Sequence, residues 1–577
     1  MSTSSSTTIL LSTMPKKRIL IVGAGAAGMS TAHHLTLGPN AANYHVTLVE
    51  ASDYCGGQAF SIPIDEARHG ASWLNQGVQG GSHIFHHTLR LFERYGTPAT
   101  PVELQVSFGK GDTFWTNVFP TKLVERHARE IRRFKRLLSV VRWTEPMWAL
   151  LPCSVFLRLF FFSSEFTNCM ILPSLALFLG TGNATPQVPT IILERLFTSP
   201  TYGMWYPADP KSLISNLPPM VVFPKFADFY GKWEADLRAR GVDIRLSTEV
   251  TQVLSRSGKG VRVALKKRTP APDKHNPQGG DEGAPKVEEE YDELVLCTLA
   301  DTSKSLLGHT ARWLENRVLG AAKFSDDLTV THWDAAYMER HYTNRFDAEQ
   351  AVSSLSGTDQ SARFTFGETQ FHPAYYIKEY KQDMRKLEMC FDCSNYQAQF
   401  PKAEGPDGEG KQGVPFERHV FQTIFLNKKD DSMWDRDEID RSQIIREDWW
   451  HQRAHISSFS AAYTDGSAVC HSWTHYLFVV PWIFLLQGRH STWFGGSWTL
   501  VNAHEVAILS GAAIAYRLGA GYPEEYEHDA FGLLCFRAYL ALVHWCWYSP
   551  RKASEGRGKG KQAWEAEAHG QVQQAEL

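Results

Sequence analysis

The stretch Ile19–Gly28, which reads ILIVGAGAAG, decides the fold of this chain. Its first four residues are apolar, which is typical of a short strand buried in a parallel sheet. The glycines at 23, 25 and 28 give G-x-G-x-x-G, and the small, helix-favouring segment Ala26–Leu37 begins at the turn. In this motif the first glycine permits the tight turn and the second lets the backbone approach a pyrophosphate. The third lets the helix pack on the strand.

An acidic residue follows at the spacing that this motif requires. A second predicted strand, His45–Val49, ends at Glu50, 22 residues after Gly28. A carboxylate there accepts hydrogen bonds from the ribose hydroxyls of an adenosine, while the helix N-terminus offers free N–H groups to the phosphates. The sequence therefore predicts a dinucleotide site built from Glu50 and from Gly23, Ala24, Gly25, Ala26, Ala27 and Gly28.

Two further segments indicate which dinucleotide binds. After Glu50 the chain continues ASDYCGGQ to Gln58, and near its other end Thr492–Trp498 reads TWFGGSW, before a predicted helix at Val506–Leu518. Together with the Rossmann motif, these segments resemble the flavin-dependent amine oxidase superfamily. The resemblance implies FAD rather than a nicotinamide cofactor. Non-covalent FAD is expected, because Cys470 lies too far upstream of the C-terminal segment to attach it.

The resemblance assigns further residues to the cofactor. It places Gly57 and Gln58 near the pyrophosphate and ribityl chain, although the superfamily often has arginine at the position of Gln58. It places Val250 at the adenine end. It places the following residues around the isoalloxazine: Gly70, Ala71, Ser72 and Trp73 on one side, and Gly495, Gly496, His504 and Glu505 on the other.

Catalytic residues are less well marked. The resemblance suggests Trp498 as one wall of an aromatic cage, and no second wall is recognisable. Lys323 is a second weak candidate, since some amine oxidases have a lysine near N5, but an ordinary surface lysine is the alternative. His332, His471 and His475 are acid–base candidates only because any histidine is one.

Other segments narrow the resemblance. Gly70–Asn75, Leu89–Glu93 and Leu328–Met338 are similar to the branch of flavoproteins associated with cyclopropane-fatty-acid synthases. Because the substrates of that branch are poorly defined, the likeness refines the expected fold more than the expected reaction.

Composition limits the class of protein. The chain has 577 residues, 43% hydrophobic and 21% charged, which is ordinary for a globular protein of more than one domain. Its net charge of −3 argues against a nucleic-acid partner. The nine cysteines fit a reducing compartment, and Cys390 and Cys393 form a single C-x-x-C that lacks a second pair, so no metal site is expected.

The predicted fold class is α/β: a Rossmann-type FAD-binding domain, discontinuous in sequence, with an inserted α+β substrate domain. Residues 1–16 are predicted to be a flexible leader. The predicted FAD-binding domain comprises residues 17–80, 215–305 and 481–525, and the substrate domain residues 81–214 and 306–480. Residues 526–577 are predicted to form an apolar helix and a disordered tail, and residues 267–290 and 402–413 to be surface loops.

Location and partners remain open at this point. The first residues lack a signal-peptide pattern, so the cytoplasm is the default. No apolar run reaches the roughly 18–20 residues of a spanning helix. The apolar segments Met147–Leu151, Val155–Phe162, Met170–Leu179, Tyr476–Leu486 and Phe531–Trp547 are either buried core or a peripheral membrane contact. The basic helix predicted over Leu123–Leu138 has the same two interpretations, a solvated face or a face toward anionic lipid.

These observations favour an FAD-dependent oxidoreductase that oxidises or desaturates a mostly apolar small molecule by hydride transfer to flavin N5. Two alternatives share the same motifs. One is a flavin-dependent double-bond isomerase without net redox change, and the other is a non-catalytic FAD-bound scaffold.

Overall fold

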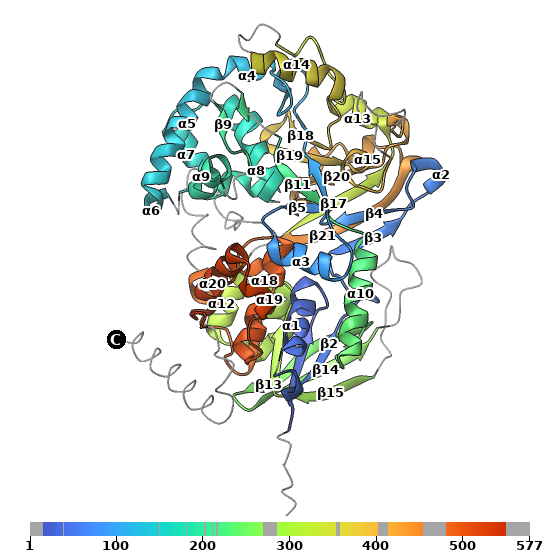
Figure 1. The fold of residues 1–577 in the computed structure, drawn as a ribbon, viewed down its shortest axis with the longest axis vertical. Helices are drawn as coiled ribbons and strands as arrows, with labels where there is room; N and C mark the ends of the chain where they lie inside the picture. The colour runs from blue at the N-terminus through green and yellow to red at the C-terminus, as the bar shows by residue number, and fades with distance from the viewer. Residues whose placement is uncertain are drawn as a thin grey trace, which may run out of the picture.

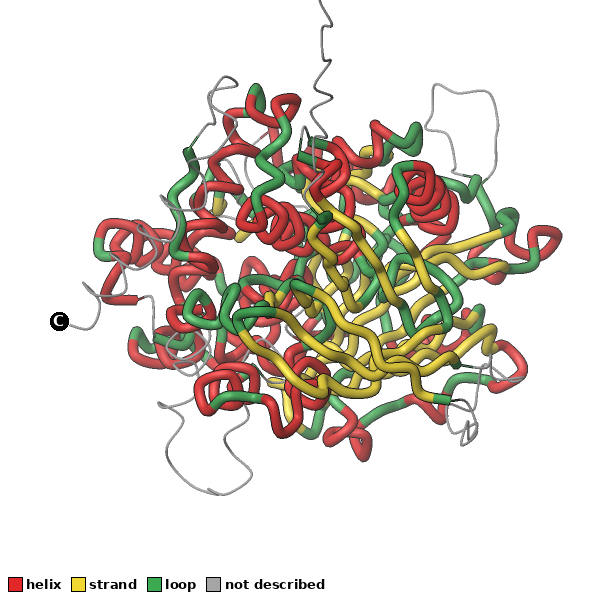
Figure 2. Tube along the Cα trace, turned by 90° about the horizontal axis from the view of Figure 1, so that it is seen from below, coloured by secondary structure: helices red, strands yellow, loops and turns green. Residues whose placement is uncertain are grey.

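The structure is a computed structural model that describes residues 15–38, 40–148, 151–179, 182–200, 204–209, 212–214, 217–268, 285–322, 324–352, 358–401, 413–453 and 480–549. Most of the predicted leader, of the loops at 267–290 and 402–413 and of the tail lies outside these ranges. Within them, no helix combines the length and the apolar character that crossing a bilayer requires. Figure 1 shows two lobes, one above the other, with strands at the centre of both and helices around them (Figure 2).

The lower lobe is built on a five-stranded parallel sheet. Its order is β12 (Asp243–Arg245), β2 (Tyr44–Val49), β1 (Lys17–Val22), β16 (Glu293–Leu296) and β22 (Thr492–Phe494). Ile19–Val22 of β1 and Leu294–Leu296 of β16 are continuous apolar runs, as expected of central strands with both faces covered. The first and last strands in the sequence thus share one sheet, as a discontinuous Rossmann-type domain requires.

Helices and a second sheet cover the two faces. On one face lie α1 (Ala26–Leu37) and α10 (Phe226–Ala239), and α18 (His504–Leu518) packs beside α1. On the other lies an antiparallel sheet of β13 (Thr248–Ser257), β14 (Gly260–Lys267) and β15 (Lys286–Tyr291). The loop predicted over 267–290 is therefore shorter than expected, since β15 begins at Lys286.

Three helices outside the predicted cofactor-binding ranges also pack on this lobe. They are α3 (His86–Arg94), α12 (Trp313–Ala321) and α20 (Ala530–His544). Leu91 and Phe92 of α3 belong to the apolar cluster between α1 and the sheet. Residues of α12 and α20 belong to the apolar cluster on the opposite face of the sheet. Packing thus groups these helices with the Rossmann-type sheet rather than with the sheet of the upper lobe.

The upper lobe is built on a seven-stranded sheet. In order, its strands are β21 (Ile444–Arg453), β17 (Phe324–His332), β20 (Phe421–Phe425), β19 (Asp383–Asp392), β18 (Tyr375–Tyr380), β7 (Val106–Phe108) and β8 (Trp115–Thr116). All neighbours pair antiparallel except β18 and β7. Short strands and helices join the lobes or border this sheet: β3 (Ala59–Pro63), α2 (Glu66–His69), β4 (Trp73–Gly77), β5 (Gly80–Ser82), β6 (Thr100–Glu103), β11 (Pro219–Val222), α11 (Ala300–Leu307), α13 (Ala335–His341), α14 (Thr358–Gln370) and α15 (Cys393–Tyr396).

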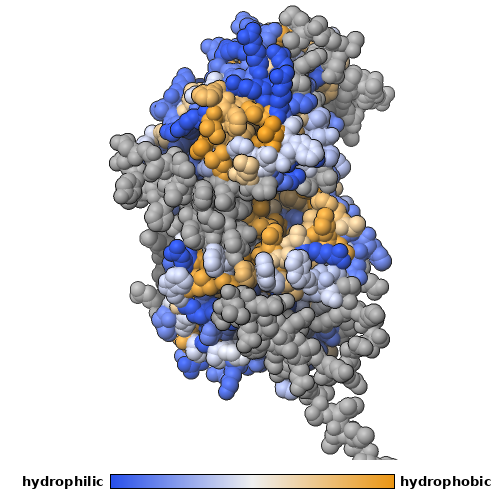
Figure 3. All heavy atoms as spheres, turned by 90° about the vertical axis from the view of Figure 1, so that its left-hand side faces the viewer, coloured by the Kyte–Doolittle hydropathy of each residue, from blue (hydrophilic) through white to orange (hydrophobic). Residues whose placement is uncertain are grey.

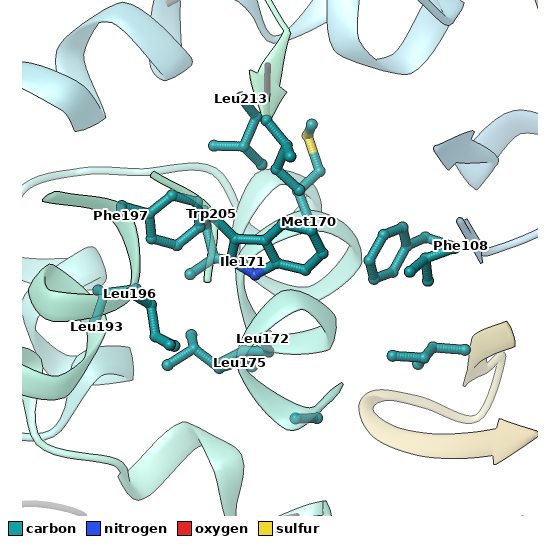
Figure 4. Packing of buried hydrophobic residues seen from close by; sticks show 14 of the residues in the cluster. Phe108, Met170, Ile171, Leu172, Leu175, Leu193, Leu196, Phe197, Trp205 and Leu213 are labelled. Carbon is teal, nitrogen blue, oxygen red and sulfur yellow. The ribbon is translucent and has the colours of Figure 1, made fainter. Parts of the chain in front are cut away.

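A helical layer flanks the upper sheet on one side (Figure 1). It contains α4 (Lys122–Arg126), α5 (Ala128–Trp143), α6 (Glu145–Trp148), α7 (Cys153–Leu159), α8 (Leu172–Leu179) and α9 (Thr190–Thr198). Trp205 lies at the centre of its core among Phe197, Met170 and Leu213 (Figure 4). The Trp205 indole N–H donates to the Ser174 carbonyl at 3.1 Å, which satisfies the only polar atom of this buried side chain. The predicted apolar segment Met170–Leu179 is thus largely core.

The contact between α1 and α18 depends on a glycine. A Cβ at Gly511 would lie 2.3 Å from the Ala27 carbonyl oxygen and 2.7 Å from the Ser30 Cβ. We therefore expect Gly511→Ala to lower the free energy of unfolding by about 1–3 kcal/mol, because the helices must separate. Gly231→Ala is the matched control, since a Cβ there meets nothing within 4 Å. It should raise stability by up to about 1 kcal/mol through helix propensity alone. Urea unfolding measures both, and equal effects would contradict the packing described.

Candidate cofactor-binding site

The turn between β1 and α1 has three glycines with three different surroundings. At Gly23, φ is +99° and a Cβ would lie 2.9 Å from the Cys297 carbonyl oxygen. At Gly28 a Cβ would lie 1.9 Å from the Gly23 carbonyl oxygen, so no larger residue fits. At Gly25 a Cβ would meet only the Gly57 Cα, at 3.9 Å. Gly23 and Gly28 thus hold the turn closed, while Gly25 faces open space.

A second glycine turn lies directly against the first. The Gly56 N–H donates to the Ala24 carbonyl at 2.9 Å, and a Cβ at Gly57 would lie 3.3 Å from the Gly25 Cα. Gly56 and Gly57 both have positive φ, +128° and +61°. Helix α1 begins here at Ala26, and no described side chain caps it. Its first N–H groups and its dipole are therefore directed toward the space beside Gly25, where an anion is favoured.

Glu50 lies at the end of β2, beside the same turn. Its carboxylate accepts the Ala24 N–H at 2.7 Å and the Ser52 N–H at 2.9 Å. The Thr248 N–H donates to the Glu50 carbonyl at 2.8 Å, which brings the start of β13, and with it the buried Val250, to this position. The structure thus gathers Gly23, Gly25, Gly28, Glu50, Gly57 and Val250 at one edge of the sheet.

The same edge receives a second helix N-terminus. After β22, the Gly495 N–H donates to the Leu296 carbonyl at 2.9 Å and the Gly496 N–H to the Ser510 Oγ at 2.9 Å. The chain then enters α18, whose N-terminus has no side-chain cap among the described residues. In open parallel sheets, ligands bind in the crevice at the carboxyl ends of the strands, where two such helix ends now converge.

The side chains of His504 and Glu505 point away from this edge. The Glu505 carboxylate accepts the N–H groups of His87 and Thr88 at 3.0 and 2.8 Å and lies 2.7 Å from His87 Nδ1. It thereby caps α3. His504 lies 2.8 Å from the Tyr230 hydroxyl. Burial lowers the pKa of His504 to about 4, whereas His87 lowers the pKa of Glu505 against the opposing effect of burial. Only the backbone N–H groups of these two residues are free to meet a ligand.

The segment predicted beside the isoalloxazine lies elsewhere. Gly70 ends α2 in a left-handed conformation against Pro401 and Val414, and Trp73 pairs with Pro63 at the far end of the β3–β4 hairpin. Trp73 is four residues along β4 from Gly77, which is roughly 13 Å at the rise of a strand. The structure therefore does not bring Gly70, Ala71, Ser72 and Trp73 to the glycine turns.

Gly77, at the near end of the hairpin, lies beside the second glycine turn. It pairs with Ala59, and a Cβ there would lie 2.2 Å from the Gln58 carbonyl oxygen and 3.2 Å from the Trp450 ring. Phe60 lies 5.7 Å from Trp450, ring to ring, so an aromatic pair borders this position. The sequence analysis did not single out Gly77, Phe60 and Trp450. The only local signal was a glycine that follows a predicted strand.

The catalytic candidates receive different environments. Trp498 is 1% exposed, and its indole N–H donates to the Thr298 and Gly495 carbonyls at 3.0 and 3.2 Å. It is therefore packed under the glycine segment rather than presented to a ligand. His332 is fully buried, which lowers its pKa to about 3. Lys323, His471 and His475 lie outside the described residues.

The surroundings of the C-x-x-C pair indicate a structural role. Cys390 in β19 and Cys393 at the start of α15 are both buried free thiols. The Thr423 hydroxyl donates to Cys390 Sγ at 3.4 Å. Among the described residues, no cluster of His, Cys, Asp and Glu has the geometry of a metal site.

His451 of β21 joins the two lobes near this site. Its ring nitrogens lie 2.5 Å from Asp301 Oδ2, at the start of α11, and 2.6 Å from Asp326 Oδ1 in β17. Burial alone would lower the pKa of His451, but the hydrogen bonds to Asp326 and Asp301 outweigh it and raise the pKa above its usual value. We call His451 with Asp301 and Asp326 the clasp. The His451 carbonyl also accepts a hydrogen bond from the side-chain amide of Gln58 at 3.4 Å, so the clasp contacts the second glycine turn.

Comparison with known proteins agrees with this geometry. A family model described as an NAD(P)-binding Rossmann-like domain matches residues 21–94. No curated protein is recognisably similar in sequence. Among solved structures, a CLA-producing fatty acid isomerase from P. acnes is similar, with 13% identity, a TM-score of 0.51 and coverage of 88% of this chain and 99% of that one.

Two amine oxidases are similar to the same extent. Cyclohexylamine oxidase from Brevibacterium oxydans has 12% identity and a TM-score of 0.51, over 87% of this chain and 100% of that one. Wild-type putrescine oxidase bound to putrescine has 14% identity and a TM-score of 0.50, over 87% and 99%. At these identities the likeness describes the fold.

The clasp generates a pH dependence. A histidine whose folded pKa is raised contributes stability that is full below its unfolded pKa of about 6.5 and is lost as the pH rises through the folded value. We expect the melting temperature of the wild type to fall more steeply above about pH 6.5 than that of His451→Gln. The exposed His309 supplies the control, His309→Gln, which should follow the wild type. Parallel melting curves for all three proteins would argue against the clasp.

Proposed function

We propose that this chain, which has the fold of the flavin-dependent amine oxidase superfamily, is an FAD-dependent oxidoreductase that oxidises or desaturates a mostly apolar small molecule. The observation that carries the proposal is the convergence of two uncapped helix N-termini, of α1 and α18, at the edge where Glu50 ends β2. One helix end suits a pyrophosphate, and a second suits the electron-rich end of a flavin.

The residues present fit an extended FAD. Gly25 leaves open the space that a pyrophosphate needs, with Gly57 opposite it. Glu50 would accept the ribose hydroxyls, and the backbone near Val250 would meet the adenine. Gly77 and the Gly495–Gly496 segment would border the isoalloxazine, in place of the predicted Gly70–Trp73. His504 and Glu505 would contribute their backbone N–H groups.

The chemistry divides between cofactor and protein. Bound FAD supplies the hydride acceptor. The protein orients the substrate and excludes water, and the pair Phe60 and Trp450 beside Gly77 offers it an apolar surface. The buried side-chain oxygen Oε1 of Gln76 has no hydrogen-bond partner among the described residues. It would accept a hydrogen bond from a donor group on a ligand and so orient that ligand.

Double-bond isomerisation is the second candidate, and the similarity in fold to a fatty acid isomerase is what favours it. The two reactions differ in their electron balance. An oxidase or desaturase consumes an acceptor in proportion to product, whereas an isomerase shifts a double bond without oxygen uptake or peroxide. A non-catalytic scaffold would bind FAD and reoxidise slowly after photoreduction, whatever compound is added.

The cofactor assignment has a direct test. Gly25→Val should abolish stoichiometric binding of FAD, because the branched side chain would enter the space for the pyrophosphate. Glu50→Gln should weaken FAD binding by about 1.5–3 kcal/mol, or roughly ten- to a hundredfold in Kd, because a charge-assisted hydrogen-bond acceptor for the ribose hydroxyls is lost. Flavin absorbance after gel filtration measures both.

Two exposed positions serve as controls. Gly258→Val introduces a side chain where nothing lies within 4 Å, and Glu290→Gln removes an exposed carboxylate of β15. Both should keep the wild-type FAD content. If Gly25→Val and Glu50→Gln also keep it, or if the wild type is colourless and stays so with added FAD, the proposal is wrong.

A further inference from the structure

Large apolar side chains are exposed to solvent along α5 and α6 and at the end of α7. Trp143 is 88% exposed, Met147 74%, Phe161 86% and Leu159 57%. Trp148 packs on Phe156 and Phe160 with ring centroids 5.4 and 5.9 Å apart, and the Arg133 guanidinium of α5 donates to the Phe161 carbonyl at 2.8 Å, so the three helices lie side by side. We call Val140, Trp143, Met147, Leu159 and Phe161 the upper patch. Monomeric proteins seldom expose such a cluster without a partner for it.

A second cluster lies on the other lobe, on and after α20. Trp547 is 76% exposed, Leu534 60%, Trp545 59% and Leu542 48%. Figure 3 shows the side of the molecule that carries α5–α9 above and α20 below, and apolar areas occur on both lobes of that side. Two separate sites of contact on one face suit a broad, flat partner.

Two of these aromatic residues are held outward by strained backbone. Phe161 has φ +54° directly after α7, and Trp545 has φ +46° at the end of α20. The Phe162 N–H donates to the Leu157 carbonyl, which completes the type of helix end where glycine is usual. The left-handed backbone conformation costs free energy at any residue with a side chain. Exposure of an apolar aromatic ring to water costs free energy as well. For Phe161 neither the backbone conformation nor the exposed ring favours the free protein, whereas Trp545 stacks on Phe484 with ring centroids 5.2 Å apart.

Positive charge accompanies the upper patch. Residues 122–148 contain eight Lys or Arg and three Glu, a net charge of +5. Arg132 and Arg136 are exposed and precede Val140 and Trp143 at helical spacing, so they continue the same stripe of α5. A stripe that changes from basic to aromatic is typical of a helix that lies at a membrane surface.

We propose that this face docks on the surface of a bilayer that contains anionic lipid, with Trp143 and Phe161 inserted at the level of the head groups. Charge complementarity selects this occupant, because a symmetric contact with a second copy would place two basic stripes together. The Trp residues of both clusters suit the interfacial zone, where the amphipathic indole is preferred. The proposal does not depend on the reaction proposed above.

The test uses the full-length protein and vesicles of phosphatidylcholine with about 30% phosphatidylserine. The protein should co-sediment with these vesicles and much less with pure phosphatidylcholine. Binding should weaken as the salt concentration is raised, because part of the attraction is screened. Absence of binding at low salt would overturn the proposal.

Paired variants locate the contact. Trp143→Ser with Phe161→Ser should lower the partition coefficient about tenfold or more, and so should Arg132→Glu with Arg136→Glu. Trp449→Ser removes a tryptophan that is 50% exposed on β21, and Lys259→Glu with Lys381→Glu makes the same change in net charge at exposed turns. Both controls should bind like the wild type.

Two outcomes would contradict the location or the partner. Undiminished binding by the Trp143 and Phe161 double variant would show that another face binds. A concentration-dependent dimer that this variant abolishes, without vesicle binding by the wild type, would assign the patch to a second copy. Circular dichroism and elution volume establish that each variant is folded, independently of any flavin.

Discussion

The close approach of α1 and α18 is the contact on which the rest of this structure depends. It is possible because Gly511 presents no side chain to the Ala27 carbonyl, and it is fixed by the Ser30 hydroxyl, which donates to the Ile508 carbonyl at 2.7 Å. These residues are more than 470 positions apart in sequence. Their contact places β22 beside β16 and directs two helix ends to one edge of the sheet. The cofactor site is a consequence of that packing.

The chain leaves this sheet after β2 and after β16 and returns at β12 and at β22, and the two lobes meet through specific polar contacts. Neutral amides form one set: the Asn75 N–H donates to Gln397 Oε1 at 2.9 Å, and Gln397 Nε2 to Gln79 Oε1 at 2.8 Å. The contact of His451 in β21 with Asp301 in α11, at 2.5 Å, forms another. Buried polar groups tolerate little misalignment, because each lost partner leaves an unsatisfied atom. The position of the upper sheet over the cofactor edge is therefore set closely.

What the sequence could predict follows from how local each feature is. Helix α1 has the predicted bounds, Ala26–Leu37, because the glycine turn and the small residues that define it are adjacent in the chain. Glu50 follows the next strand in the chain, so its place beside the turn could be predicted for the same reason. The place of Gly70–Trp73 could not, because α2 lengthens the connection between β3 and β4, so that Gly77, and not Trp73, lies at the end of the hairpin beside the glycine turns. The side chain of Glu505 could not be assigned, since its partner His87 is 418 residues away.

Hydrophobicity alone could not separate core from exposed surface either. Met170–Leu179 and Val155–Phe162 are alike in composition, yet the first surrounds Trp205 while the second ends in the exposed Leu159 and Phe161. The difference arises from the helix end after α7, where backbone hydrogen bonding turns Phe161 outward and Phe162 inward. A glycine at position 161 would remove the backbone strain, and a polar residue there would remove the cost of exposing an apolar ring to water. An aromatic residue does neither, and this cost to the free chain is what supports the proposed contact of Phe161 with a partner outside it.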